Sequence, residues 1–147
     1  MPSSSPSEET RIPLEFHHLG LAVKSPEQAT GFLHGLGYRA EEPVHDPLQR
    51  VNLRMFHSPS MPSVELIWPG AEPSPIDKIV LKHGSAIYHA CYNCNDLPGA
   101  LKRMRSLGLK VLELSPPTPA VLFGGQTVSF YSVTGFGIIE IIDRASG

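Results

Sequence analysis

The sequence has no apolar segment approaching the roughly 18 to 20 residues of a membrane-spanning helix, and its amino-terminal stretch, MPSSSPSEETRIP, lacks the apolar run of a signal peptide. It also lacks an excess of either charge, because 12 Lys and Arg residues stand against 14 Asp and Glu residues. A net charge of −2 offers no basic surface for nucleic acid or for an anionic membrane. We therefore expect a cytoplasmic protein that binds neither nucleic acid nor a membrane.

Cysteine is nearly absent as well, since the chain has only Cys91 and Cys94, in the tetrapeptide CYNC. A zinc site of the CxxC type needs a second pair of ligands, and the sequence has no second cysteine pair. On a strand, a separation of three residues points two thiols to opposite faces. The sequence thus favours neither a disulfide nor a zinc site, and it places Cys91 on the same strand face as His89.

Glycine and proline, by contrast, are abundant, with 13 and 15 residues in a chain of 147. Residues that break helices and strands so often disfavour a helical bundle and favour many short strands joined by turns. The length fits one domain with a sizeable core. Residues 1–13, which are mainly Ser, Pro and Glu, are expected to be a disordered tail, and residues 14–144 to form a single folded domain.

An internal repeat divides this domain. Shifting the sequence by 71 residues aligns HLGLAVKSPEQATGFLHGLGY, from His18, with HACYNCNDLPGALKRMRSLGL, from His89. In both copies a strand-like run is followed by a helix signal. Ser25 is predicted as the N-cap of the first helix, with Pro26 in its first turn, and Asp96 as the N-cap of the second.

Three further strand candidates follow each helix, near residues 38–44, 50–57 and 63–68 in the first copy and 109–114, 127–132 and 137–143 in the second. The pattern predicts an α+β fold of two tandem βαβββ modules. Module one covers about 14–70 and module two about 86–143. A short helix over about 74–84 links them, since it has a start signal at Ser74 and a stop at Gly84.

Two carboxylates interrupt apolar strands, Glu65 in VELIW and Glu140 in GIIEII. An ionised carboxylate is expensive to bury without a partner, so each needs a cation or a strong donor beside it. Arg50 and Arg54 are alternative partners. On the first strand, the alternation of side chains places His18, Gly20 and Ala22 on one face, and these small neighbours are expected to leave a hollow beside His18.

Each module therefore supplies one histidine from its first strand and one glutamate from its last: His18 and Glu65, then His89 and Glu140. Two imidazoles and two carboxylates form a mixed nitrogen and oxygen site suited to a divalent transition metal. Such a site leaves positions on a six-coordinate ion for substrate oxygens. His17 is expected to point to the opposite face of its strand.

The chain also resembles a known family in the segments FHHLGLAV, VELIWP with SPIDKIVLKHG, IYHACYNCNDLPGALKRMRSLG, and PPTPAVLFGGQTVSF ending in IIEII. Over about residues 15–143 it resembles the vicinal oxygen chelate superfamily of glyoxalases, bleomycin-resistance proteins and extradiol dioxygenases, and within it methylmalonyl-CoA epimerase. The resemblance implies an open, barrel-like mixed sheet around a metal ion and a homodimer. It also implies His18, Glu65, His89 and Glu140 as metal ligands, with Gln or Glu at the position of Glu65.

One segment departs from these epimerases. Those epimerases share an acidic residue just before the tripeptide Gln-Gly-Val, and this residue serves as a proton-transfer base. In the corresponding segment here, HDPLQRVNL, Leu48 stands at that position and Arg50 replaces the glycine. Asp46 lies two residues earlier and is the predicted substitute base. Glu140 is predicted to be both a ligand and the residue that takes or returns a proton.

These features predict a metal-dependent epimerase or isomerase that acts through an enolate on a small-molecule substrate, an acyl-CoA or a related acyl-thioester. The cofactor is a divalent ion of Co, Ni, Zn, Mn or Fe. Leu48 keeps another metalloenzyme of the same superfamily open, such as a lyase, hydrolase or dioxygenase. A third reading is a metal-free binding or resistance protein, although such a protein has no need of buried carboxylates.

Overall fold

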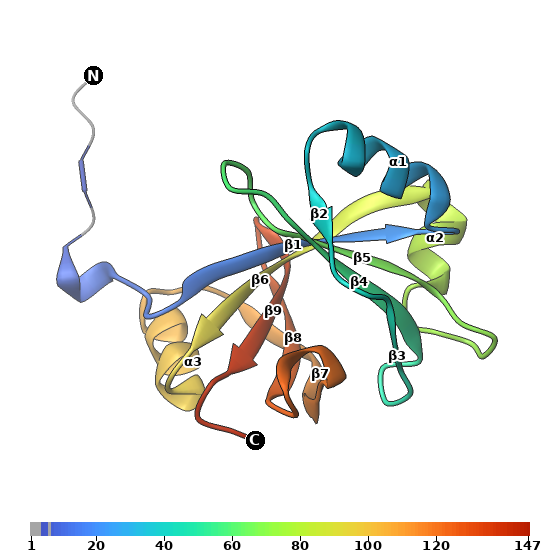
Figure 1. The fold of residues 1–147 in the computed structure, drawn as a ribbon. Helices are drawn as coiled ribbons and strands as arrows, with labels where there is room; N and C mark the ends of the chain where they lie inside the picture. Colours follow the sequence, from blue (N-terminus) through green and yellow to red (C-terminus); the bar gives the residue numbers. More distant parts are fainter. Residues whose placement is uncertain (1–3, 6) are drawn as a thin grey trace.

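Nine strands form one mixed sheet in the computed structural model, which describes residues 4–5 and 7–147 (Figure 1). The strands are β1 (Glu15–Val23), β2 (Arg39–Ala40), β3 (Val44–Asp46), β4 (Val51–His57), β5 (Val64–Pro69), β6 (Ser85–Cys94), β7 (Val111–Pro119), β8 (Thr127–Val133) and β9 (Gly137–Asp143). The helices are α1 (Glu27–Gly35), α2 (Asp77–His83) and α3 (Leu97–Ser106), with short 3-10 helices η1 (Glu8–Thr10) and η2 (Val121–Phe123).

The sheet consists of two halves with the same topology. Its strand order is β2-β4-β5-β1-β6-β9-β8-β7, with β3 also pairing with β4. In each half the first strand lies parallel to the last, β1 to β5 and β6 to β9, and the halves meet at the antiparallel pair β1 and β6. The predicted α+β fold of paired βαβββ units in an open mixed sheet is confirmed, and α2 is the helix between the two units.

Alternation along β5 separates the two faces of the first half. Leu66 is buried beneath α1, where it packs in one cluster with Leu33. Glu65 and Ile67 point to the other face, which α2 partly covers through Val80. A strand that is apolar on both faces is expected in a sheet covered on both sides, and Glu65 is the exception in this one.

Two helix starts test the capping predictions. Asp96 caps α3 as predicted, since its side chain accepts a hydrogen bond of 3.1 Å from the Gly99 N–H. The N-cap predicted at Ser25 is wrong, because Pro26 already has helical dihedral angles, occupies the N-cap position and makes no side-chain cap. Its carbonyl accepts the N–H of Thr30 at 2.9 Å, so α1 begins at Glu27.

Two predicted strands differ from those observed. The strand expected over 38–44 is split into β2 and β3, with Pro43 in the gap, because proline has no N–H to donate to a strand ladder. The strand expected over 109–114 continues as β7 to Pro119, through three prolines. This is possible because β7 is the last strand of the sheet, where prolines are tolerated.

Part of the amino-terminal segment contacts the second half of the sheet. Of the tail expected over 1–13, residues 1–3 and 6 lie outside the described residues. Farther along, Glu8–Thr10 form η1, and Ile12 and Leu14 pack against the cluster of Leu97 and Met104 in the second half. Ile12 thus gives this polar segment an apolar contact with the second half, and the expected disorder of the tail stays a prediction.

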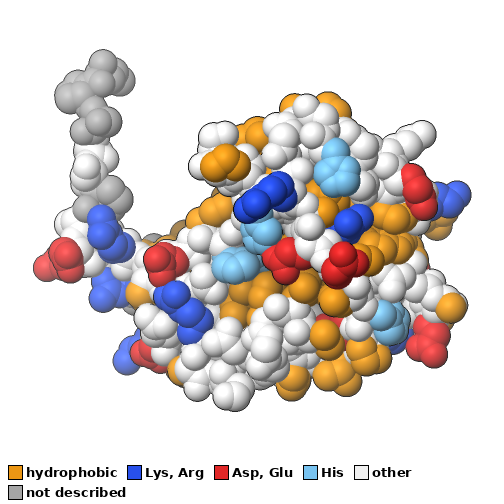
Figure 2. Space-filling model, viewed as in Figure 1, with side chains coloured by type: hydrophobic (Ala, Val, Ile, Leu, Met, Phe, Trp, Pro, Cys, Tyr) orange, Lys and Arg blue, Asp and Glu red, His pale blue; other side chains and the backbone are white. Residues whose placement is uncertain are grey.

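The surface agrees with the charge balance of the sequence. On the face in Figure 2, acidic and basic side chains lie interspersed among apolar and neutral ones. Within residues 4–5 and 7–147, none of the helices combines the length and the apolar character needed to span a bilayer.

Candidate metal centre and adjoining cavity

Four polar side chains meet at the middle of the sheet, on β1, β5, β6 and β9, and we call this set the candidate metal centre: His18, Glu65, His89 and Glu140. One possible ligand atom from each lies within 4.8 Å of the others. The side chains are at most 4% exposed. The structure thus brings together the four residues that the sequence predicts as ligands.

The strand register explains why these four converge. Gly20 and Cys91 lie two positions after the two histidines of the candidate metal centre. Each pairs on one side with the glutamate of its own half, and on the other side with the histidine of the opposite half. The two halves therefore contribute equivalent ligands, and neither half holds all four.

The nitrogen and oxygen atoms crowd toward one point. Glu140 Oε1 lies 3.3 Å from His18 Nε2 and 3.2 Å from His89 Nε2. Glu65 Oε1 lies 3.6 Å from the first of these nitrogens and 3.9 Å from the second. Each of these four distances separates an imidazole nitrogen from a carboxylate oxygen. Ligand atoms around a bound cation are grouped in this way.

Several of these atoms have no hydrogen-bond partner among the described residues: His18 Nε2, both ring nitrogens of His89 and Glu140 Oε1. A buried polar atom left without a partner costs about 1 to 3 kcal/mol, so such atoms are rarely grouped. A divalent ion would satisfy the Nε2 atoms and Oε1 together, and two imidazoles with two carboxylates suit a transition metal. The residues present fit a bound divalent metal.

The alternative partners are not in place. Arg54 donates from Nε to the carbonyl of Glu41 at 2.7 Å. Among the described residues, neither Arg54 nor Arg50 forms an ion pair with the glutamates of the candidate metal centre. Pairing with these arginines therefore does not explain the buried carboxylates.

Neighbouring side chains shift the pKa values of two residues in this centre, His18 and Glu140. Burial lowers the pKa of His18, but the neighbouring carboxylates of Glu140 and Glu65 outweigh burial and raise the pKa to about 9. Burial raises the pKa of Glu140, but His89 and His18 outweigh it and hold that pKa well below its usual range. A proton on His18 and a metal ion would compete for the same nitrogen.

His17 does not point to the opposite face, and that prediction is wrong. An irregularity in the β1 and β6 register between Phe16 and His18 turns the ring of His17 back, and its Nδ1 lies 2.7 Å from Nδ1 of His18. A hydrogen bond at one ring nitrogen fixes which nitrogen is free to bind a metal, so this contact directs Nε2 of His18 to the centre. The two consecutive histidines are a sequence signal for this contact, but the sequence does not show the irregularity of β1 that produces it.

The hollow predicted beside His18 is filled by the ring of His89. A Cβ atom added to Gly20 would come within 2.1 Å of His89 Cε1, because the imidazole occupies the space above the glycine. Gly20 and His89 are cross-strand neighbours in the β1 and β6 pair. Sequence alone does not reveal which partner strand fills a gap.

Cys91 shares the buried face of His89, as predicted, and it pairs with Glu140 on β9. Its thiol lies near the nitrogens of His17 and His18. Burial, together with the charges of Glu140 and Glu65, raises the pKa of this thiol far above its usual value. A thiol held in its protonated form packs as a small apolar group rather than acting as a thiolate ligand.

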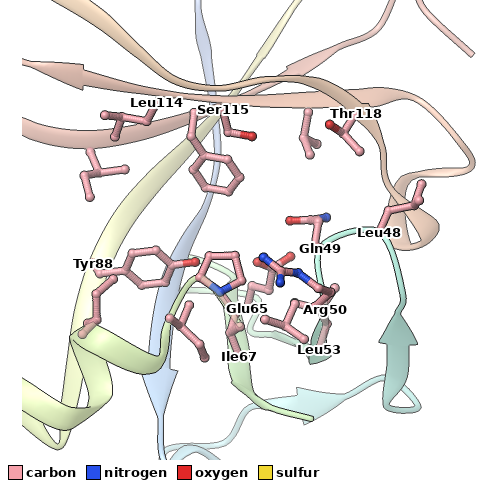
Figure 3. A pocket seen from close by; sticks show the side chains of 17 residues that line it. Leu48, Gln49, Arg50, Leu53, Glu65, Ile67, Tyr88, Leu114, Ser115 and Thr118 are labelled. Atoms are coloured by element: carbon pink, nitrogen blue, oxygen red, sulfur yellow. The ribbon is translucent and has the colours of Figure 1, made fainter. Parts of the chain in front are cut away.

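A cavity of about 380 Å³ adjoins the candidate metal centre and draws its walls from both halves (Figure 3). Among the four residues of the centre, Glu65 lines it. Most of the wall is apolar, and the polar lining residues are Gln49, Arg50, Glu65, Tyr88, Ser115 and Thr118. A largely apolar pocket with a few convergent polar groups is typical of a small-molecule site.

The turn over 47–50 supplies part of this wall, and Leu48 lines the cavity as an exposed apolar side chain. Asp46, the predicted substitute base, is fully buried and does not line the cavity. Its Oδ1 accepts the N–H groups of Leu48 and Gln49 at 3.0 Å each. Its Oδ2 accepts the Gln49 side-chain amide at 2.9 Å and the Val121 N–H at 3.4 Å.

These contacts indicate a structural role for Asp46. It holds the turn that presents Leu48 and Arg50, and it joins β3 of the first half to η2 of the second. Both oxygens are engaged, which argues against Asp46 as a proton-transfer base. The catalytic role of Asp46 stays a prediction from the sequence.

Replacing Asp46 with alanine is expected to lower the free energy of unfolding by about 1 to 3 kcal/mol, because buried N–H donors lose their acceptor. Urea denaturation measures this change. Glu42→Ala, at an exposed neighbouring position, is the control, with an expected change within about 0.5 kcal/mol. An Asp46→Ala variant as stable as the parent would refute the structural part assigned to this carboxylate.

Comparisons with known proteins place these features in a context. Residues 17–130 match the family model described as Glyoxalase/Bleomycin resistance protein/Dioxygenase superfamily. An ethylmalonyl-CoA/methylmalonyl-CoA epimerase of Cereibacter sphaeroides is 29% identical over 103 residues, which are 69% of this chain and 76% of that protein.

Two solved structures have the same fold. The methylmalonyl-CoA epimerase of Mycobacterium tuberculosis has a TM-score of 0.70 at 21% identity, over 88% of this chain and 87% of that one. A hypothetical protein of Bacillus halodurans has a TM-score of 0.74 at 22% identity, over 91% and 96% of the two chains.

Proposed function

Because the chain belongs to the glyoxalase, bleomycin resistance protein and dioxygenase superfamily, we propose that it is a metal-dependent epimerase or isomerase. Its proposed substrate is an acyl-CoA or a related acyl-thioester that reacts through an enolate. The observation that carries the proposal is the convergence of unpartnered donor atoms from His18, His89 and Glu140 beside a cavity. The Cereibacter sphaeroides relative, named for two acyl-CoA substrates, supports this substrate class.

The four residues of the candidate metal centre would hold the ion, which the donor set limits to a divalent metal such as Co, Ni, Zn, Mn or Fe. Once bound, such an ion polarises a carbonyl oxygen and stabilises the negative charge of an enolate. The chain supplies the surroundings for this chemistry. Apolar side chains around the cavity exclude water, and the hydroxyl groups of Tyr88, Ser115 and Thr118 are placed to orient a polar substrate.

We propose Glu140 as the residue that moves the proton at the substrate carbon next to the thioester. Its Oε1 faces both histidines and has no hydrogen-bond partner among the described residues. Glu65 is the other candidate for this step, because its carboxylate lines the cavity. The two glutamates come from different halves of the sheet.

Leu48 bears on the stereochemical outcome. Two bases on opposite sides of a carbon invert its configuration, whereas one base favours exchange or isomerisation on a single side. An apolar Leu48 lines the cavity where the epimerases that this chain resembles carry an acid. We therefore propose that the protein exchanges the α-proton faster than it inverts the centre.

Incubation with methylmalonyl-CoA or ethylmalonyl-CoA in deuterated water tests the proposal, with Co²⁺, Ni²⁺, Zn²⁺, Mn²⁺ and Fe²⁺ supplied in turn. Mass spectrometry should show deuterium at the α-carbon, and chiral analysis should show slower inversion. Removal of the metal with a chelator should stop the exchange. If neither thioester exchanges its proton with any of these ions, these two substrates are ruled out.

Leu48 also favours a second candidate, a lyase, hydrolase or dioxygenase that uses the same centre without a second base. Consumption of oxygen by the iron-loaded protein would support a dioxygenase. A metal-free binding protein is less well supported, because it gains nothing from the two buried carboxylates. A homodimer, which the family resemblance implies, is retained as a proposal that sedimentation can test.

A further inference from the structure

Arg50 stands out by its backbone. Its φ angle is 58°, and among the described residues it is the one non-glycine residue with a positive φ. This region of backbone conformation favours glycine. Arg50 therefore has a backbone conformation that is unfavourable for a residue with a large side chain. Such strain is most often found where a side chain serves a function.

The side chain of Arg50 lies in the wall of the cavity, together with Gln49 and Glu65 (Figure 3). Around the same cavity lie the apolar side chains of Leu53 and Ile76. Arg50 itself is exposed to solvent, so its guanidinium is open to an entering anion. Arg50 is the one cationic side chain among the residues that line this cavity.

Within the described part of the chain, the Arg50 guanidinium has no ion-pair or hydrogen-bond partner. Among the described residues no carboxylate forms an ion pair with Arg50, and no side-chain hydrogen bond engages it. Hydrogen bonds from Ser74, and to a smaller extent the charge of Arg50, lower the pKa of Asp77. This carboxylate is fully exposed and forms no ion pair with Arg50. Arg50 therefore presents a free cation to whatever enters the cavity.

Leu48, on the same turn as Arg50, also bears on the charge of the cavity wall. An acid at position 48 would lie on the same turn and would offset the charge of Arg50. With Leu48 neutral, the turn over 47–50 adds one positive charge, that of Arg50, to a cavity wall whose carboxylate is Glu65.

We propose that Arg50 is a specificity-determining residue that binds an oxyanion group of the substrate inside the cavity. The planar guanidinium matches a carboxylate or phosphate with two parallel hydrogen bonds. The oxyanion is either a carboxylate of the acyl group or a phosphate of the carrier to which the acyl group is attached. The identity of the substrate rests on the proposed function, but the need for an anion does not.

Calorimetric titration with two probes, malonate and unacylated coenzyme A, tests this inference. Arg50→Gln should weaken binding of the recognised anion by about 10- to 100-fold, the range expected for a charged hydrogen bond. Arg50→Lys should lose less, and Arg39→Gln, an exposed arginine outside the cavity, should bind as the parent does. A loss confined to malonate identifies the carboxylate, and a loss confined to coenzyme A identifies the phosphate.

A structural readout separates recognition from stability. Arg50→Gly should raise the midpoint of thermal unfolding, because glycine relieves the positive φ, while it weakens anion binding. A residue kept for stability alone would show the opposite change in midpoint. Malonamide, a neutral analogue, should bind the parent and Arg50→Gln equally.

The titrations are run on the chelator-treated protein and again on the metal-loaded protein. The anion site is thereby measured even if the candidate metal centre binds no ion, so failure of the proposed function leaves this test intact. The inference is overturned if the parent binds neither probe, or if Arg50→Gln binds both as tightly as the parent.

Discussion

A Glu140→Gln variant is expected to lose α-proton exchange by about 100-fold or more, because an amide cannot take up and return the proton, and a general base contributes about 10²- to 10⁴-fold. Glu65→Gln is expected to keep most of the exchange. An amide oxygen remains available as a ligand there.

The comparison of these two variants assigns the proton transfer. Exchange is followed by mass spectrometry at saturating metal concentration, so that weaker metal binding does not imitate a chemical defect. Both glutamates are almost fully buried and approach the same histidine nitrogens, which makes each variant a control for the other. A larger loss in Glu65→Gln would move the base to the carboxylate that lines the cavity.

Gly20→Ala is expected to weaken metal binding by about 10- to 100-fold, the effect seen when the support of a ligand histidine is disturbed. The new Cβ would come within 2.1 to 2.5 Å of three ring atoms of His89, so the imidazole must leave its place. Larger residues such as Val should have a stronger effect. Titration with Co²⁺, followed by its absorption spectrum, measures the change.

Gly31→Ala is the matched control, because a Cβ at Gly31 meets nothing within 4 Å and the position lies inside α1. Alanine in a helix should stabilise the fold by about 0.5 to 1 kcal/mol and leave metal binding unchanged. If Gly20→Ala folds with the stability of the parent and binds Co²⁺ as tightly, the close approach of His89 does not position this ligand.

The sequence was sufficient for the topology and for the convergence of the four buried polar residues. Glu65 and Glu140 were recognisable because carboxylates are costly inside apolar strands, and the repeat linked each to a histidine. Their meeting at one point follows from the parallel pairing of first and last strands in both halves. Periodicity and the repeat together carry this information.

Other features depend on the neighbours of a strand, which the sequence does not specify. The sequence predicts a gap beside His18, on the same strand as Gly20, but the ring of His89 on β6 fills this gap. A local irregularity of β1 turned His17 back toward His18. The position of Asp46 in the sequence predicts a catalytic base, and the structure shows both of its carboxylate oxygens accepting hydrogen bonds from surrounding N–H groups.

Arg50 illustrates a third kind of information. The sequence shows an arginine in place of a glycine, but not that the position keeps a positive φ or that the side chain lines the cavity. Backbone conformation and cavity shape arise from the whole fold. They are the reason for proposing that this arginine binds an anion.

The most direct test is the number of divalent ions bound per chain, measured by equilibrium dialysis against Co²⁺ with elemental analysis. We predict one ion per chain for the parent and for Cys91→Ser, and none held tightly by His18→Ala or His89→Ala. Retention of one tightly bound ion by both histidine variants, or the failure of the parent to bind any, would contradict a metal centre built from both halves of the sheet.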